Sequence, residues 1–394
     1  MSRMESSKLW GKITILVALC GWALSAQAKY DGGSGEPNNP YQISSVADWQ
    51  ELMTTPADWA SHFVLTGDLD LDGVLLSPIG NDANNFTGVF EGSDYIIRNA
   101  VINQPADYFV GLFGYLGYGG QIRNLGVEDA NISGFRFVGG LVGRDYSGTI
   151  SSCYATGAVT GQGEIGGLAG TNEHGTISHC YATAVVTSTS LPDHYYFSFV
   201  GGLCGGNWGI ISGCYATGTV AGTGWVVGGL VGINYAPVSY CYATGAVTGI
   251  IGAGGLAGYN YPDSYATITA CFWDMWTSGQ AGSSGGTRKT TVEMQTLSTF
   301  TAAGWDFVGE TTNGPNDVWR MCVDGVDYPQ LTWEYVQVGD FACPDGVNAG
   351  DLMVLCEDWL SPYSQALYGA DANGDKQVTF ADFAILAQRW LSAL

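Results

Sequence analysis

Apolar and polar positions repeat together along the central part of this 394-residue chain. A leucine preceded by two glycines recurs at intervals of 27, 35, 27 and 26 residues, and a cysteine followed by an aromatic residue recurs at intervals of 27, 34, 27 and 30 residues. Because both patterns share a period of about 27 residues, we interpret the region as a tandem repeat. The leucines are Leu141, Leu168, Leu203, Leu230 and Leu256, and the cysteines are Cys153, Cys180, Cys214, Cys241 and Cys271.

Each repeat predicts strands and turns rather than helices. Apolar residues at helical spacing are missing, and each glycine would cost roughly 1 kcal/mol inside a helix. One repeat divides instead into three short strands, VGGLVGRD, TISSCYAT and GAVTG, separated by turn residues. Stacking such repeats gives an all-β fold, a parallel β-solenoid whose neighbouring strands lie about 4.8 Å apart.

Stacking also lays equivalent side chains of successive rungs over one another. The five cysteines are expected to form an inward column of small, polarizable side chains. An aromatic column is expected beside it, formed by Tyr154, Tyr181, Tyr215, Tyr242 and Phe272.

The column of cysteines leaves two interpretations open. Buried free thiols are one, and disulfides between stacked neighbours are the other, because an exported protein favours disulfides. Metal binding is disfavoured, since no C-x-x-C spacing occurs. Cys343 and Cys356 are a separate candidate pair in the tail.

A second duplication lies near the C-terminus. Residues 351–360 and 382–391 align at an offset of 31, and each predicts an amphipathic helix. The segment DANGDKQVTFAD precedes the second helix and has oxygen-bearing residues at the loop positions that a Ca²⁺ site requires. The predicted ligands are Asp371, Asn373, Asp375, Gln377 through its carbonyl, Thr379 and Asp382.

The first copy of this loop is a weaker candidate. Asp340, Asn348 and Asp351 hold its positions 1, 9 and 12, but Ala342 and Pro344 occupy positions 3 and 5. Because fewer charged ligands bind Ca²⁺ more weakly, this loop is expected to bind poorly or not at all.

The N-terminus predicts export. Basic residues precede an apolar run that ends in Ala26-Gln27-Ala28, as in a signal peptide cleaved after Ala28. No later segment is long and apolar enough to cross a membrane, so we expect a secreted or cell-surface protein. The net charge of −23 argues against nucleic acid and anionic membranes as partners.

Polysaccharide binding is the functional hypothesis that the aromatic residues favour. The longest repeat carries an insertion at 187–198, and insertions in solenoids often form the binding face. His194, Tyr195 and Tyr196 of the insertion, with Trp208 and Trp225 from neighbouring repeats, are the candidate ligand-binding residues. A loop packed on itself is the alternative.

No catalytic residue is predicted. The four histidines form no H-E-x-x-H motif, and no G-x-S-x-G elbow occurs. The serious alternative is a polysaccharide lyase or glycoside hydrolase, since right-handed β-helices include such enzymes. Early rungs contain Arg98, Arg123, Arg136 and Arg144 near acidic residues, which we interpret as surface ion pairs.

The repeat resembles a known family. Its consensus, GGLVGxNxGxIxxCYATGxVxG, resembles the GLUG repeat of bacterial surface and secreted proteins, which include IgA-cleaving peptidases and adhesin-like proteins. This resemblance implies a β-solenoid scaffold and supplies no active site.

The tail resembles a type I dockerin. That resemblance implies a calcium-folded module that docks onto a cohesin-like or cell-surface partner, commonly in polysaccharide-degrading assemblies. Lys376 replaces the usual loop glycine, and Phe380 and Ala381 stand at partner-facing positions. The expected divisions are a signal peptide at 1–28, a cap and opening rungs at 29–85, the solenoid at 86–275, a C-terminal cap or linker at 276–337 and the calcium module at 338–394.

Overall fold

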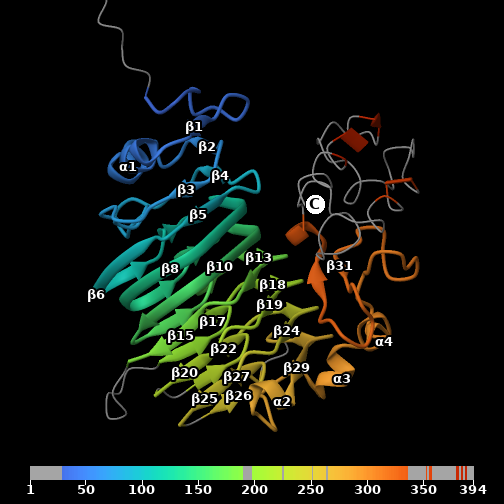
Figure 1. The fold of residues 1–394 in the computed structure, drawn as a ribbon. Coiled ribbons are helices and arrows are strands. Elements are labelled where there is room, and N and C mark those ends of the chain that lie inside the picture. Colours follow the sequence, from blue (N-terminus) through green and yellow to red (C-terminus); the bar gives the residue numbers. More distant parts are fainter. Residues whose placement is uncertain are drawn as a thin grey trace, which may run out of the picture.

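The fold is a long parallel β-coil with a short helical cap at its N-terminal end and an irregular segment along one side (Figure 1). The computed structural model describes residues 29–189, 198–223, 226–250, 252–262 and 265–335, with isolated positions between 352 and 387. The predicted signal peptide and most of the predicted calcium module therefore lie outside the described residues. No helix within the described part of the chain is long and apolar enough to span a membrane.

The N-terminal end of the coil is closed by a short helix. Ser45 and Asp48 form a capping box at the start of this helix, and Trp49 and Leu52 are buried beneath it. Trp49 makes edge contacts with Phe90 and Phe113 of the first rungs. The elements are β1 (Tyr41–Ile43), α1 (Val46–Thr54), η1 (Pro56–Asp58), β2 (His62–Leu65) and β3 (Leu69–Asp70).

The coil itself confirms the predicted parallel β-solenoid. Every pairing between successive rungs is parallel and lays like residues together, as in Tyr181 against Tyr215 and Tyr215 against Tyr242. The opening strands are β4 (Val89–Glu91), β5 (Ile96–Arg98), β6 (Val101–Val110), β7 (Phe113–Leu116), β8 (Gln121–Gly139), β9 (Val142–Tyr146) and β10 (Thr149–Gly161).

Later rungs each contain about five short strands instead of the three predicted. One cause is a bend directly before the cysteine, where His179, Gly213, Tyr240 and Ala270 all have positive φ. These strands are β11 (Glu164–Gly166), β12 (Ala169–Glu173), β13 (Thr176–Ser178), β14 (Tyr181–Ala182), β15 (Val185–Ser188), β16 (Phe199–Gly201), β17 (Cys204–Asn207), β18 (Ile210–Ser212), β19 (Tyr215–Ala216), β20 (Val220–Gly222), β21 (Val226–Gly228), β22 (Val231–Asn234), β23 (Val238–Ser239), β24 (Tyr242–Ala243), β25 (Val247–Gly249), β26 (Ala253–Gly254), β27 (Ala257–Asn260), β28 (Ile268–Thr269) and β29 (Phe272–Asp274).

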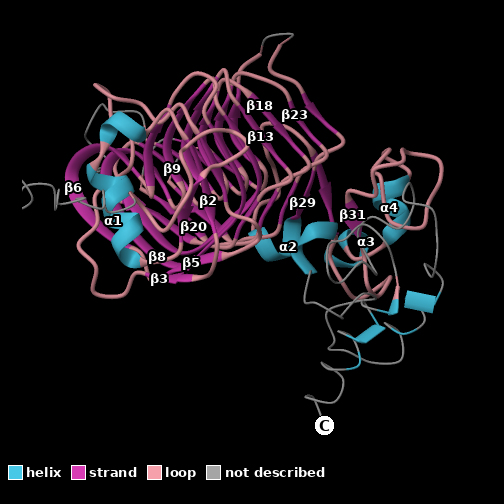
Figure 2. Ribbon diagram, turned by 90° about the horizontal axis from the view of Figure 1, so that it is seen from above, coloured by secondary structure: helices cyan, strands magenta, loops and turns pink. Residues whose placement is uncertain are grey.

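The strands form two parallel sheets around one core. A six-stranded sheet contains β7, β9, β12, β17, β22 and β27, and a 24-stranded sheet makes up the rest of the coil. Seen from above, β18 and β23 lie on the opposite side of the coil from β20 (Figure 2). The repeated leucines and the five cysteines are all buried inside the coil.

All five cysteines of the column are free thiols, so neighbouring rungs are not joined by disulfides. Each backbone N–H of Cys153, Cys180, Cys214 and Cys241 donates to the sulfur one rung later, at 3.4 Å. Cys356 is also free, so the candidate Cys343–Cys356 pair does not form. Cys322 is disulfide-bonded.

The segment after the last full rung follows two paths. Residues 279–289 cover the end of the coil, where the backbone N–H of Gly255 donates to the Gly282 carbonyl. Residues 291–335 run beside the coil instead of over its end, and they cover the tyrosine column (Figure 1). The elements are α2 (Met275–Ser278), β30 (Thr287–Lys289), α3 (Thr291–Met294), α4 (Leu297–Thr301), β31 (Trp319–Arg320), β32 (Gln330–Leu331) and η2 (Thr332–Tyr335).

Candidate functional site

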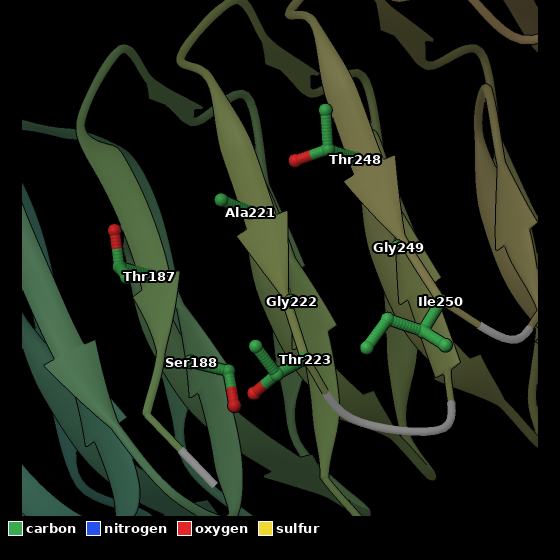
Figure 3. Close-up of a pocket in the computed structure, with 8 residues that line it drawn as sticks. All are labelled: Thr187, Ser188, Ala221, Gly222, Thr223, Thr248, Gly249 and Ile250. Atoms are coloured by element: carbon green, nitrogen blue, oxygen red, sulfur yellow. The ribbon is translucent and has the colours of Figure 1, made fainter. Parts of the chain in front are cut away.

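A groove of about 310 Å³ lies on the outer side of the coil, where three successive rungs end in turns (Figure 3). Strands β15, β20 and β25 supply it, and their valines Val186, Val220 and Val247 point into the core. Because side chains alternate along a strand, the neighbouring residues face outward. The groove is lined by Thr187, Ser188, Ala221, Gly222, Thr223, Thr248, Gly249 and Ile250.

The groove lies beside the base of the insertion. Ser188 ends β15, and its hydroxyl lies 2.9 Å from that of Ser198, which precedes β16, so the two stems of the insertion are joined. His194, Tyr195 and Tyr196 lie outside the described residues, as does Trp225, which follows Thr223 by two positions in the sequence.

The chemistry of the groove is that of an uncharged binding surface. Its lining contains hydroxyl groups, backbone and small apolar side chains, and it contains no titratable side chain. Hydroxyl groups accept and donate hydrogen bonds, while Ile250 offers exposed apolar area. Such a lining can hold a neutral, polyhydroxylated ligand, but it offers no general acid or base.

Trp208 lies at a different corner of the coil from the groove, between β17 and β18. Its ring stacks on Tyr235 at 5.2 Å, and Tyr235 stacks on Tyr261 at 4.8 Å. Because the rings cover one another's faces, this column exposes ring edges rather than the flat platform that a sugar ring would stack on. Its position relative to His194, Tyr195, Tyr196 and Trp225 stays a prediction, because those residues lie outside the described part of the chain.

The charged residues of the solenoid gather on its early rungs as cross-rung ion pairs. Arg98 pairs with Asp68 and Glu128, Arg123 with Glu91, Arg136 with Glu164 and Arg144 with Glu173. No lysine or arginine occurs between Arg144 and Arg288. The glutamates Glu91, Glu128, Glu164 and Glu173 thus each have an arginine as partner, whereas Asp145 has no ion-pair partner among the described residues.

Arg144 is the most enclosed of these cations. Its guanidinium lies 5.0 Å from the ring centre of Tyr115 and 5.5 Å from that of Tyr146, and Phe109 and Phe137 lie 5.7 Å away. Cation–π contacts of this kind stabilise a cation in place. The cluster also holds Glu173 at 2.6 Å, so it forms a closed structural unit on the outside of the six-stranded sheet.

Two buried carboxyl groups have strongly perturbed acidity. Burial raises the pKa of Asp145 to about 7, with the N–H of Gly148 opposing this shift and the charge of Glu173 adding to it. Burial likewise raises the pKa of Glu334 to about 7, although the hydroxyl of Tyr215 donates to its carboxylate at 2.7 Å. Asp145 has 0% relative exposure, so a ligand in solution cannot reach it.

The predicted calcium ligands lie almost entirely outside the described residues. Asp340, Asn348, Asp351, Asp371, Asn373, Asp375, Gln377 and Asp382 are all in this class, and Thr379 is the one ligand with a described position. Within the described residues, no group of three or more His, Cys, Asp or Glu side chains is placed to hold a metal ion.

The structure contains a ladder of hydrogen-bonded asparagines that was not predicted from the sequence. Asn172, Asn207, Asn234 and Asn260 are joined from rung to rung by side-chain hydrogen bonds of 2.8–2.9 Å. Each stands four positions after the leucine of GGLxG, so the repeat pattern contains the signal. Asp145 occupies the same position in the preceding rung.

Comparison with known proteins supports the repeat assignment. The model of the GLUG motif matches residues 161–187, 200–221 and 223–248. Halomucin of Haloquadratum walsbyi is 36% identical over 141 residues, which are 33% of this chain and 2% of that protein. An Evansella cellulosilytica protein, provisionally named a Gly-rich membrane protein, is 33% identical over 126 residues, or 30% of this chain and 14% of that protein.

A solved structure shares the fold. A Bacteroides ovatus protein, provisionally described as an immunoglobulin A1 protease, superimposes with a TM-score of 0.59 at 21% identity, covering 78% of this chain and 96% of that one. The chain spans only 2% and 14% of the length of the two curated relatives. Fold and repeat together define the class: this chain is a parallel β-solenoid. In particular, it is a solenoid that carries GLUG repeats.

Proposed function

We propose that this protein is a secreted or surface-attached, non-catalytic β-solenoid of the adhesin type, and that the groove at β15, β20 and β25 is its binding site. The names of the relatives support a location at the cell surface, since one is a mucin-like name and the other names a membrane protein. The observation that carries the proposal is the groove itself, which lies at the base of the insertion.

The proposed ligand is a neutral polysaccharide. Four of the eight lining residues are Thr or Ser, and the others are Ala, Gly and Ile, so the groove offers hydrogen bonds without charge. The surrounding rungs contain no cation that would favour an acidic glycan. Tyr195 and Tyr196 of the insertion, with Trp225, are the aromatic residues proposed to stack on the sugar rings of this ligand.

The test compares retention of the protein on a panel of immobilised neutral and acidic polysaccharides. Replacing Thr223 and Thr248 together by valine keeps the shape and removes two hydroxyls, which should weaken binding by about tenfold or more. Thr160→Val is the matched control, because Thr160 pairs with Thr187 in the same sheet but lies outside the groove. Equal retention of both variants and the wild type would contradict the assignment.

An enzymatic function is the second candidate, because lyase chemistry uses a base beside a cation and the buried Glu164 carboxylate lies beside the partly exposed guanidinium of Arg136. A lyase or hydrolase would release unsaturated products or new reducing ends from the same polysaccharides. Retention without such products supports the binding protein, whereas products that disappear in Arg136→Ala support the enzyme.

The tail is proposed to attach the solenoid to a partner. The calcium loop at 371–382 and its weaker copy at 340–351 form the basis of this proposal, and a cohesin-like or other cell-surface protein is the proposed partner.

A further inference from the structure

A buried ladder of side chains runs along the coil, in which Asp145 is followed by four asparagines. Strand pairing sets Asp145 against Asn172, Asn172 against Asn207, Asn207 against Asn234 and Asn234 against Asn260. Each asparagine amide nitrogen Nδ2 donates to the Oδ1 of the next asparagine, at 2.9, 2.8 and 2.8 Å. The ladder therefore has a direction, with donors pointing toward the C-terminal end of the coil.

Backbone groups fix this direction. The Nδ2 of Asn172, Asn234 and Asn260 also donates to a backbone carbonyl, at 3.3, 2.8 and 3.0 Å. The Oδ1 of Asn207 accepts the backbone N–H of Gly209 at 3.2 Å. Rotating any of these amides by half a turn would set acceptor against acceptor or donor against donor, so the assignment of nitrogen and oxygen is determined by the fold.

Asp145 has the same placement with one chemical difference. Its Oδ1 accepts the backbone N–H of Gly148 at 2.8 Å, as an asparagine Oδ1 does in later rungs. Its Oδ2 then stands where each asparagine has the donor Nδ2. Asp145 Oδ2 and Asn172 Oδ1 are both buried and have no hydrogen-bond partner among the described residues.

These two orphan atoms border the same space beside Gly175. A methyl group added at Gly175 would lie 2.1 Å from Asp145 Oδ2 and 2.8 Å from Asn172 Oδ1, so both oxygens line one small space. Two buried acceptors facing each other without a donor cost free energy, because neither recovers the hydrogen bonds it made to water. One proton between them removes both defects.

We propose that Asp145 is protonated in the folded protein and donates from Oδ2 to Oδ1 of Asn172, so that it is the first donor of the ladder. The side-chain hydrogen bond between the rung of Arg144 and the rung of Glu173 therefore depends on this proton. Loss of the proton would place a negative charge against an amide oxygen inside the coil and remove that hydrogen bond.

The surroundings agree with a protonated carboxyl near neutral pH. Burial is the main cause that raises the pKa of Asp145 to about 7, and the negative charge of Glu173 on β12 acts in the same direction. Cys204 on β17 is another titratable group that interacts with Asp145, and burial raises the pKa of its thiol, so it stays neutral. The neighbouring cation, Arg144, is bound to Glu173.

The sign of the pH effect follows from this shift. A carboxyl whose pKa is raised on folding binds more protons in the folded state than in the unfolded state, so its contribution to stability falls as pH rises from about 4 to about 7. Replacing Asp145 by asparagine supplies a permanent donor of the same shape. The stability of the variant should therefore not show this decrease as pH rises.

The experiment measures thermal unfolding of the full-length wild type and Asp145→Asn from pH 4 to pH 9. Their midpoints should agree within about 1 °C near pH 4, and the variant should become more stable than the wild type as pH rises, by about 3 °C or more above pH 7. Asp107→Asn, which changes an exposed carboxyl, should follow the wild type throughout. A variant that is less stable than the wild type at every pH would overturn the proposal.

Three further measurements distinguish a proton at this site from a bound cation. Infrared difference spectra between wild type and Asp145→Asn at pH 6 should show one buried carboxylic acid band in the wild type alone, and its absence would refute protonation. The double variant Asp145→Asn with Asn172→Asp moves the acid one rung along, and the pH-dependent loss should reappear. Stabilisation of the wild type by Na⁺, K⁺ or Ca²⁺ at pH 8 that is absent from Asp145→Asn would assign a cation to the site instead.

Discussion

At the scale of single residues, the solenoid is stabilised by columns of identical side chains. In the cysteine column, each thiol fills a buried position, and the sulfurs of Cys180, Cys214, Cys241 and Cys271 accept a backbone N–H from the preceding rung at 3.4 Å. A sulfur acceptor is weak, but it satisfies a backbone donor that would otherwise be buried alone. The cysteine thus has a structural role that needs no oxidation.

Replacing Cys214 by alanine tests this role. The variant leaves a small cavity and an unpaired N–H at Cys180, so the free energy of unfolding should fall by about 1–3 kcal/mol. Chemical denaturation measures the change. Cys356→Ala, at an exposed free thiol, is the control and should be nearly neutral.

The thiols themselves provide a second readout. Burial raises the pKa of the Cys180 and Cys241 thiols, and both side chains have 0% relative exposure. A thiol reagent should modify the five column thiols only after unfolding. Rapid reaction of the native protein at these positions would contradict the inward column.

The columns also show what the sequence can reveal at this scale. Five cysteines at one period predicted a column directly, because their identity and spacing are both conspicuous. The asparagines have the same period but stand among turn residues, where asparagine is common, so their ladder was overlooked. The role of Asp145 depends on the direction of the hydrogen bonds between rungs, which the amino-acid sequence alone does not specify.

At the scale of elements, residues 291–335 act as a lateral cover for the tyrosine column. Trp305 packs on Tyr242 and Phe272, and Trp333 stacks on Tyr181 at 5.7 Å. Side-chain hydrogen bonds fix the register, including those from Trp305 Nε1 to the Ala270 carbonyl and from Trp333 Nε1 to the His179 carbonyl. The cover therefore runs back along the coil, toward earlier rungs.

Trp305→Ala should detach this cover. The ring has 0% relative exposure among Phe300, Trp319 and Phe272, so its loss should cost about 3–5 kcal/mol. Tryptophan fluorescence and limited proteolysis report on the cover, while far-ultraviolet circular dichroism should keep the strand signal of the coil. Trp276→Ala, at a ring that is 68% exposed, should change neither.

The position of this cover could not be predicted from its sequence. Loss of the repeat after Phe272 indicated a different element, and the open end of a solenoid suggested where it would go. The actual docking site is the outer face of the tyrosine column, which the repeat predicted, but nothing in the sequence of residues 291–335 indicated that they would cover it. Only the stacked coil creates the continuous aromatic strip that the tryptophans contact.

At the scale of the whole molecule, different regions of the chain contain different kinds of functional groups. The ion pairs lie on the early rungs, the neutral groove lies on the later rungs, and the candidate calcium ligands lie in the tail. The periodic sequence was sufficient to predict the coil, because each rung contacts only its neighbours. The groove was not predictable, since it arises where the turns of three rungs meet beside an insertion.

Calcium titration of the full-length protein tests the proposed role of the tail. Calorimetry should detect one strong site, or two unequal sites, and Asp371→Ala with Asp375→Ala should abolish the stronger one. Thermal unfolding of the coil should shift little with calcium, because the proposed ligands are outside it. Absence of heat from the wild type would refute the calcium assignment, and loss of heat in the control Asp70→Asn would place the ion elsewhere.

The stretch without lysine or arginine between Arg144 and Arg288 has a consequence outside the cell. Proteases that cut after basic residues find no target along these rungs, whether the coil is intact or opened. The part of the molecule that contains the groove is thus protected from such proteases by its composition as well as by its fold.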